Sequence, residues 1–299
     1  MAATAPDVLS QETCLLRPGN TNCGGCGMST GLTMLGRALE EAGDSCTLVI
    51  PACCGVVTAG AYPTTSYGVP VIAATFASAA AVASGVASIR DLNGEPGQVI
   101  CWAGDGGTYD IGLGTLSAAA ERNENIIYIC YDNEIYGNTG GQRSSATPLG
   151  ARTSTTPGGK TEGKKDIMSI MAAHRVPYAA TLSIAHPQDF AQKMKTAFSL
   201  KGTRFLLMHS PCPTGWKSEP EDSIHLIRLA VASGLFPLYE VFGGSTYRIN
   251  IEPDGTDPAE YFNRQRRFRD EEIDLDETRR ACSDRMQRLE ALAEQYSAD

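Results

Sequence analysis

The chain has 299 residues, of which 42% are apolar and 20% are charged, and its net charge is −9 at neutral pH. This length can bury a sizeable core in one or two domains, whereas the acidic balance argues against binding to nucleic acid, which would require a basic patch. The sequence contains neither a run of about eighteen apolar residues nor an N-terminal signal region, so we expect a cytoplasmic protein without a membrane span.

Two cysteine-containing loops precede the centre of the chain. Residues 1–18 show no periodicity and predict an extended arm. The loop that follows contains Cys23-Gly-Gly-Cys26, a spacing that can place two thiolates on one metal centre. A helix is predicted at residues 28–41 and a short strand at residues 47–51, which ends at Cys53-Cys54.

The central stretch predicts a βαβ unit. An apolar run at residues 99–103 stops at the turn Gly104-Asp105-Gly106-Gly107, and a helical pattern follows at residues 110–122. A second apolar run, residues 126–131, ends at Asp132-Asn133. Strand, helix and strand in this order build a parallel sheet, and ligands of such sheets bind at the carboxyl ends of the strands.

The residue types at these strand ends suit a diphosphate and a divalent cation. Glycines at positions 104, 106 and 107 let the backbone approach a bulky group, and a following helix offers free N–H groups. Asp105 and Asn133 supply the hard oxygen ligands that Mg²⁺ takes and shares with phosphates. A ligand-free turn is the competing interpretation, and a nicotinamide site is disfavoured because the third glycine of that fingerprint is missing.

The second half of the chain continues the alternation of strands and helices. Residues 137–166 form a long polar stretch that predicts a loop over the cofactor, and its lysines 160, 164 and 165 predict a solvated face. Residues 245–262 predict an irregular strand or hairpin, and residues 269–296 a charged helix or arm that packs on a partner. Further strands are predicted at residues 71–76, 178–182 and 204–209, and further helices at residues 77–89, 167–174, 187–199 and 223–234.

Four cysteines fall in loops that a parallel sheet would gather at one edge. They are Cys23, Cys26, Cys54 (or Cys53) and Cys212. Four thiolates suit Zn²⁺ or an iron–sulfur cluster, but the second Cys-x-x-Cys of a zinc ribbon is missing. Buried cysteines without a metal remain the alternative.

The motifs resemble one family. Gly104-Asp105-Gly106 followed by a helix, a strand and Asn133 resembles the thiamin diphosphate motif. Together with CGGCG, FASAAAVASG, YDNEIYGNTGGQRSSATP and CPTGW, in this order, it resembles the β subunit of the pyruvate (2-oxoacid):ferredoxin oxidoreductases. The match runs over about residues 17–242, and it implies an α/β fold with the doubly wound parallel sheet of thiamin-diphosphate-binding proteins. We therefore expect a cofactor-binding domain at residues 1–244 and a C-terminal extension at residues 245–299.

The resemblance also implies cofactors and their ligands. It implies a [4Fe–4S] cluster on Cys23, Cys26, Cys54 and Cys212; Cys54 is preferred because relatives usually carry one cysteine there after a small residue, whose place Cys53 takes. It implies Mg²⁺ on Asp105, Asn133 and the Ile135 carbonyl, with the diphosphate on residues 104–107. Asn138 matches a catalytic asparagine near the thiazolium. The implied cofactor contacts are Cys54, Gly104, Asp105, Gly106, Gly107, Asn133, Ile135, Tyr136, Gly137 and Asn138.

The implied reaction is the CoA-dependent oxidative decarboxylation of a 2-oxoacid, with electrons passed to ferredoxin. A second cofactor core is not found in the sequence, so an α subunit should supply the pyrimidine-binding domain and its activating glutamate, and γ and ferredoxin-like δ subunits should complete the enzyme. Pyruvate is the default substrate; branched-chain, aryl, 2-oxoglutarate and oxalate variants stay open. Asn20 and Met28 depart from the usual histidine and acidic residue of relatives, which leaves local cofactor contacts open.

Two other interpretations are compatible with parts of the sequence. One is a non-redox thiamin diphosphate enzyme subunit, such as a decarboxylase or transketolase-like half with structural zinc. The other is a zinc-binding interaction module without catalysis. The four cysteines at loop positions argue against the first, and the pairing of Asp105 with Asn133 argues against the second.

Overall fold

The computed structural model describes residues 14–58, 65–268 and 273–295. These residues form one eight-stranded sheet with the order β2-β1-β3-β4-β6-β5-β7-β8. The strands are β1 Cys46–Pro51, β2 Val71–Ala74, β3 Gln98–Gly104, β4 Ile127–Asp132, β5 Tyr178–Ser183, β6 Arg204–His209, β7 Leu238–Phe242 and β8 Thr246–Ile251. The six strands from β2 to β5 in the sheet are parallel, whereas β7 and β8 extend it as an antiparallel hairpin.

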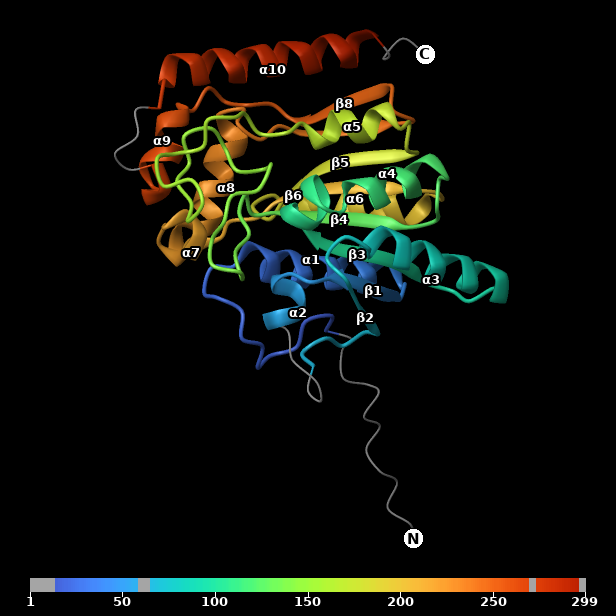
Figure 1. The fold of residues 1–299 in the computed structure, drawn as a ribbon. Helices are drawn as coiled ribbons and strands as arrows, with labels where there is room; N and C mark the ends of the chain where they lie inside the picture. The colour runs from blue at the N-terminus through green and yellow to red at the C-terminus, as the bar shows by residue number, and fades with distance from the viewer. Residues whose placement is uncertain (1–13, 59–64, 269–272, 296–299) are drawn as a thin grey trace.

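Helices cover both faces of the sheet, as Figure 1 shows. On one face α1 packs against α6, and on the other α3 packs against α4. The helices are α1 Gly27–Ala42, α2 Cys54–Thr58, α3 Ala79–Asn93, α4 Leu113–Glu121, α5 Ile167–Ala173, α6 Pro187–Ser199, α7 Pro213–Trp216, α8 Ser223–Ala232, α9 Pro258–Asn263 and α10 Leu275–Gln295. The predicted doubly wound α/β fold is therefore confirmed.

The central strands are buried, as is usual for parallel strands. Every residue of β4, β5 and β6 is buried, as expected for strands covered by helices on both faces. In β8, by contrast, exposed and half-buried residues alternate. Figure 1 shows β2 at one end of the sheet and β8, with α10 beside it, at the other.

The chain changes direction between β1 and β3. From β1 it continues to β2 on one side, and from β3 to β4 on the other, while β1 and β3 are themselves hydrogen-bonded neighbours. Such a switch point opens a crevice at the carboxyl ends of the two strands. The crevice lies where residues 52–57 follow β1 and residues 104–107 follow β3.

Helical structure after β3 starts earlier than predicted. The prediction placed the helix at residues 110–122, whereas a π-helical turn forms at Gly106–Asp110 and α4 starts at Leu113. Glycine disfavours helix interiors, but the chain needs it here: a Cβ on Gly112 would lie 1.9 Å from the Gly107 carbonyl oxygen. Single π-helical turns are frequent at functional sites.

The two ends of the described chain pack on its own core. Residues 1–13 of the predicted arm lie outside the described residues, but Leu15 and Leu16 are buried, so the arm prediction is wrong for this part. The predicted C-terminal helix exists as α10, and its residues Cys282 and Met286 pack beside the turn at Gly234. The boundary at residue 245 falls within the β7–β8 turn, and the division into two domains stays a prediction. Across the described ranges, no helix combines the length and the apolar character needed to cross a bilayer.

Candidate functional site

A cavity of about 240 Å³ opens at the switch point of the sheet. Its walls come from the carboxyl ends of β1, β2, β3 and β4 and the segments that follow them, and all ten predicted cofactor contacts line it. The complete lining is Ala52, Cys53, Cys54, Val56, Val57, Phe76, Gly104, Asp105, Gly106, Gly107, Tyr131, Asn133, Ile135, Tyr136, Gly137, Asn138 and Thr139. The fold thus brings together residues that lie up to about 90 positions apart, because parallel strands end at one edge.

Glycine is required at position 106 on the floor of this cavity. A Cβ on Gly106 would lie 1.9 Å from the Tyr136 ring, whereas one on Gly107 would make an ordinary contact, 3.4 Å from the Phe76 ring. Phe76 and Tyr136 contact each other edge-on, with ring centroids 5.9 Å apart. The N–H groups at the start of a helical turn have no hydrogen-bond partners within the helix. Because the glycines carry no side chain, an anionic group could approach these N–H groups directly.

Three oxygen donors meet beside the glycine turn. Asn133 Oδ1 accepts a hydrogen bond from the Ile135 N–H (3.3 Å). The same end of the amide lies 2.7 Å from the Ile135 carbonyl oxygen and 2.9 Å from Asp105 Oδ1. If this end of the amide is the oxygen, it faces the Ile135 carbonyl oxygen and Asp105 Oδ1 with no hydrogen between them. If the amide is flipped, its nitrogen donates hydrogen bonds to both of these oxygens. A hard divalent cation fits the first arrangement, since it takes carboxylate, amide and carbonyl oxygens.

A cation beside Asp105 would also change the ionisation of its carboxyl group. Asp105 is 2% exposed, and burial, together with the neighbouring Asp132 carboxylate, raises the pKa of Asp105 well above its usual value. A bound cation stabilises the ionised carboxylate and so reverses this shift. The residues present therefore fit Mg²⁺.

The long polar loop folds back onto the site. Residues 137–166 contain no helix or strand, as predicted, and Ser144 Oγ donates a hydrogen bond to Asp105. Thr147 Oγ1 donates to the Glu134 carbonyl (2.7 Å). The loop therefore contacts the two strand ends that carry the oxygen donors.

The prediction that the loop lysines form a solvated face is wrong. Lys160 is 2% exposed, and its Nζ donates to the Thr147 carbonyl at 2.7 Å. Lys164 lies between the carboxylates of Asp132 and Glu134, and Lys165 donates to a backbone carbonyl. Three cations thus fasten the loop to buried acceptors, and the sequence carried no signal of this beyond the lysines themselves.

The predicted cluster cysteines approach one another at the other side of Gly137. A Cβ on Gly137 would lie 3.6 Å from Cys54 Sγ and 3.8 Å from Cys212 Sγ. The Gly27 N–H donates to the Pro211 carbonyl (3.0 Å), which joins the Cys23–Cys26 loop to the Cys212 loop. Within the described ranges, no three His, Cys, Asp or Glu side chains already stand in the arrangement of a metal centre.

The thiols of these cysteines influence one another. Burial raises the pKa of Cys54 to about 12, and the thiols of Cys212, Cys53 and Cys26 add to the shift. Burial raises the pKa of Cys212 to about 11; the Gly215 N–H lowers it in part, and the thiols of Cys26 and Cys23 raise it. The thiols of Cys23 and Cys26 thus act on those of Cys54 and Cys212, and a metal centre would favour the ionised form of thiols that bind it.

Cys53 and Cys54 face different surroundings. Cys54 is half-buried, and the backbone N–H of Asn138 faces its thiol. Cys53 is buried, and burial raises the pKa of its thiol. The neighbouring Tyr131 side chain and Gly104 backbone offset part of this rise. Cys54 is thus the member of the pair that faces Cys212 and Cys26.

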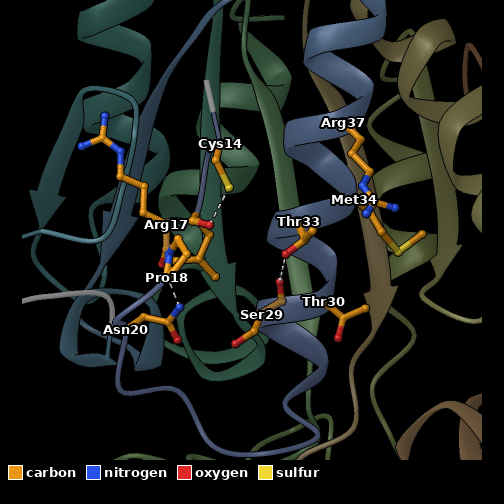
Figure 2. A pocket seen from close by; sticks show the side chains of 10 residues that line it. Cys14, Arg17, Pro18, Asn20, Ser29, Thr30, Thr33, Met34 and Arg37 are labelled. Carbon is orange, nitrogen blue, oxygen red and sulfur yellow. Dashed lines mark hydrogen bonds between the residues drawn. The ribbon is translucent and has the colours of Figure 1, made fainter. Parts of the chain in front are cut away.

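A second, open groove of about 560 Å³ lies between residues 14–20 and α1. Figure 2 shows Arg17 and Arg37 on opposite sides of it, with their guanidinium groups well apart. Its charged side chains do not converge on one place, so we assign no ligand to it.

Two curated relatives cover most of the chain. Pyruvate synthase subunit PorB of Methanothermobacter marburgensis is 45% identical over 85% of this chain and 89% of the relative. Ketoisovalerate oxidoreductase subunit VorB of Pyrococcus horikoshii is 42% identical over 93% of each chain. Both are named as subunits, which are parts of larger complexes.

A family model and a solved structure agree with this similarity. Residues 52–209 match the model "Thiamine pyrophosphate enzyme, C-terminal TPP binding domain". The fold is similar to a chain of 2-oxoglutarate:ferredoxin oxidoreductase from Magnetococcus marinus, with a TM-score of 0.63, 22% identity, and coverage of 88% of this chain and 93% of that one. At this identity the structural match supports the fold.

Proposed function

The chain belongs to the family of β subunits of the 2-oxoacid:ferredoxin oxidoreductases, and from this premise we propose that it holds the diphosphate end of thiamin diphosphate, Mg²⁺ and one [4Fe–4S] cluster. The chain is accordingly a subunit of an oxidoreductase that depends on thiamin diphosphate. The finer assignments of metal, cluster, substrate and partners are argued below.

The observation that carries the proposal is the meeting of three oxygen donors beside a glycine turn. Asp105 Oδ1 and the Ile135 carbonyl oxygen each lie within hydrogen-bonding distance of the same end of the Asn133 amide. They would hold Mg²⁺, and the backbone of residues 104–107 would hold the diphosphate. Tyr136 closes this end of the cavity, and a Cβ at Gly106 would displace it.

The cysteine end of the cavity suits an electron acceptor. When bound, thiamin diphosphate supplies the carbon nucleophile and electron sink for 2-oxoacid decarboxylation, and an iron–sulfur cluster accepts single electrons. Cys23, Cys26, Cys54 and Cys212 would hold the cluster. The segment Gly137–Asn138 lines the cavity and also faces the thiol of Cys54, so we assign Asn138 a place between the two cofactors.

The proposed reaction is the CoA-dependent oxidative decarboxylation of a 2-oxoacid to acyl-CoA and CO₂, with electrons passed to ferredoxin. Pyruvate is the first candidate substrate, because relatives at 45% identity are named pyruvate synthase subunits. A branched-chain 2-oxoacid is the second, because the ketoisovalerate relative covers 93% of the chain at 42% identity. A non-redox function with structural zinc does not suit a family of oxidoreductases.

We assign the remaining parts of the enzyme to partner subunits. The described residues form one sheet with one glycine-turn site, so an α subunit would bring the pyrimidine-binding domain with its activating glutamate. Subunits of the γ and ferredoxin-like δ type would complete the complex, and residues 245–299 would pack on one of them. We expect the isolated chain to show no 2-oxoacid- and CoA-dependent reduction of a viologen dye, and the assembled complex to show it.

The test compares cofactor content in the native complex and in an Asp105→Asn variant. The native complex should contain thiamin diphosphate, magnesium, iron and sulfide, and it should reduce the dye with pyruvate and CoA. Asp105→Asn should lose thiamin diphosphate and magnesium but keep its iron, because Asp105 lies at the oxygen end. A folded Asp105→Asn variant with undiminished thiamin diphosphate would overturn the assignment of the cation site.

A further inference from the structure

A chain of buried ion pairs lies directly behind the three oxygen donors. Lys164 Nζ lies 2.6 Å from Asp132 Oδ2 and 2.9 Å from Glu134 Oε1. An Arg267 guanidinium nitrogen lies 2.6 Å from Glu134 Oε2. The side chains of Asp132, Glu134 and Arg267 are 0%, 6% and 1% exposed. We call these four residues the Glu134 network.

The Glu134 network joins three segments that are distant in the sequence. Asp132 and Glu134 lie at the end of β4, Lys164 comes from the polar loop, and Arg267 comes from the C-terminal part of the chain. Each carboxylate oxygen of Glu134 has its own cation, one from each of the other two segments. The orientation of Glu134 is therefore fixed from both sides.

The backbone of Glu134 needs this support. Its φ is +62°, in the left-handed region that residues with a Cβ rarely adopt. The Glu134 N–H donates to Asp132 Oδ1 (3.2 Å), and its carbonyl accepts from Thr147 Oγ1 (2.7 Å). A strained residue that is held by side-chain and backbone contacts alike points to a functional constraint.

Glu134 stands between two of the three oxygen donors. Asn133 precedes it and Ile135 follows it, so a change in its backbone moves both donors at once, whereas Asp105 on the neighbouring strand is unaffected. Arg267 supports Asn133 by a second route. Its guanidinium group lies 4.4 Å from the centre of the Trp216 ring, and the Trp216 indole N–H donates to the Asn133 carbonyl (2.8 Å).

We propose that Glu134, clamped between Lys164 and Arg267, is a positioning residue that makes the Asn133 amide and the Ile135 carbonyl converge with Asp105 on the cation. This inference rests on the proposed function, because it assigns a role toward the Mg²⁺ of the same site. The Glu134 network does not touch the reacting atoms; it acts through the turn that carries two donors. Residues that orient metal ligands from behind typically change metal affinity by about 10-fold to 100-fold when they are replaced.

The test measures Mg²⁺ affinity in the native complex at saturating thiamin diphosphate, with cofactor fluorescence or equilibrium dialysis as the readout. Glu134→Gln keeps the size of the side chain and removes its charge, and it should weaken Mg²⁺ binding by about 10-fold or more. Arg267→Lys keeps the positive charge, so it should retain more affinity than Arg267→Met. Such a rescue is not expected if the Glu134 network only adds general stability.

A matched control is the buried pair of Lys193 and Asp189 in α6. Their side chains are 0% and 11% exposed and lie 2.8 Å apart, and neither residue lines the cavity. Lys193→Met should lower the melting temperature while Mg²⁺ affinity stays within about twofold of the native value. Equal losses of affinity in Lys193→Met and Glu134→Gln would overturn the positioning role.

The outcomes separate this inference from the proposed function. Asp105→Asn with undiminished Mg²⁺ and thiamin diphosphate binding refutes the proposed cation site. Loss of binding in Asp105→Asn together with native affinity in Glu134→Gln refutes only the positioning role. If Glu134→Gln does not fold, Lys164→Gln decides the question, because the Lys164 side chain is 27% exposed and its replacement is better tolerated. Native Mg²⁺ affinity in Lys164→Gln would then reject the inference.

Discussion

The oxygen end and the sulfur end of the cavity are built in different ways. At the oxygen end, Asp105, Asn133 and Ile135 are between 2% and 7% exposed. They are surrounded by hydrogen bonds from Ser144 and Trp216 and by the Glu134 network. The polypeptide itself thus fixes the positions of these three residues before any ligand binds.

At the sulfur end, Cys23 and Cys26 lie in the loop before α1, while Cys54 and Cys212 lie at the starts of α2 and α7. Cys23 is exposed, and Cys26, Cys54 and Cys212 are half-buried. Nearby hydroxyl groups of Ser210, Ser218 and Ser223 are buried without a hydrogen-bond partner. Backbone hydrogen bonds within the described chain connect these segments, such as that from the Gly27 N–H to the Pro211 carbonyl (3.0 Å).

The difference indicates how each end depends on its ligand. A site whose donors are fixed by buried contacts should keep its structure when the ligand leaves. A site made of loop cysteines gains much of its order from the metal centre, because metal binding and local folding are coupled. The following predictions test this contrast.

The largest expected effect separates two adjacent cysteines. Cys54→Ser should lose all bound iron, because the Cys54 thiol faces Cys212 and Cys26. Cys53→Ser should keep its iron, because that thiol is turned towards Tyr131 in the core. Iron analysis and EPR of the reduced protein measure the outcome. If Cys53→Ser lost its iron and Cys54→Ser kept it, the cluster ligand would be Cys53 and not Cys54.

The next effect concerns the glycine floor of the oxygen end. Gly106→Ala would bring a Cβ to 1.9 Å from the Tyr136 ring, so the ring must move and the cavity must change shape. We expect thiamin diphosphate affinity to fall by about 10-fold to 100-fold. Gly114→Ala is the matched control, since a Cβ there meets nothing within 4 Å. It should leave affinity unchanged and stabilise α4 by up to about 1 kcal/mol. Equal affinities in both variants would show that the turn tolerates a Cβ.

The sequence predicted that Asp105 and Asn133 lie close together, because each residue directly follows a strand that the local sequence pattern identifies. Strand periodicity placed Asp105 and Asn133 at neighbouring strand ends, and both now line one cavity. The Glu134 network was not predicted, because Glu134 and Arg267 are 133 residues apart and an ion pair over this distance has no local signal. Lys164 was visible in the sequence, but its burial depends on how the polar loop folds.

Two short elements near the C-terminus, β7 and α9, were also missed. β7 has five residues, and it forms the hairpin with β8 through Gly243 and Gly244, both with positive φ. Two glycines between apolar runs indicate a hairpin. The sequence analysis predicted a strand or hairpin only from residue 245 onward and so left out β7. α9 has six residues, and its Asp257 cap and Pro258 were a readable start signal.

Hydrogen exchange should show the contrast between the two ends directly. Removal of iron from the native complex should raise amide exchange in residues 20–27 and 211–216 by about 10-fold, since these loops lose the centre that orders them. Removal of Mg²⁺ and thiamin diphosphate should change exchange in residues 132–135 by less than about twofold, because buried contacts persist. Equal changes at both ends would mean that the oxygen end also depends on its ligand.

The smallest effect compares two neighbouring serines of the polar loop. Ser144 Oγ donates to Asp105, whereas Ser145 Oγ donates to Asp110, outside the cavity lining. A hydrogen bond to a charged group contributes about 1.5–3 kcal/mol, but the Ser144 bond can form with and without the cation. Mg²⁺ affinity depends only on how much stronger this hydrogen bond is with the cation bound than without it. We therefore expect Ser144→Ala to weaken Mg²⁺ binding by about threefold.

Ser145→Ala removes a hydroxyl from the same loop and should leave Mg²⁺ affinity unchanged, because Asp110 contributes no donor to the proposed cation site. Magnesium titration at saturating thiamin diphosphate distinguishes the two variants. Equal weakening would mean that the loop acts as a whole rather than through the Asp105 contact. No weakening in either variant would mean that β3 and the Glu134 network alone orient the three oxygens, which would make the oxygen end still more independent of the loop that covers it.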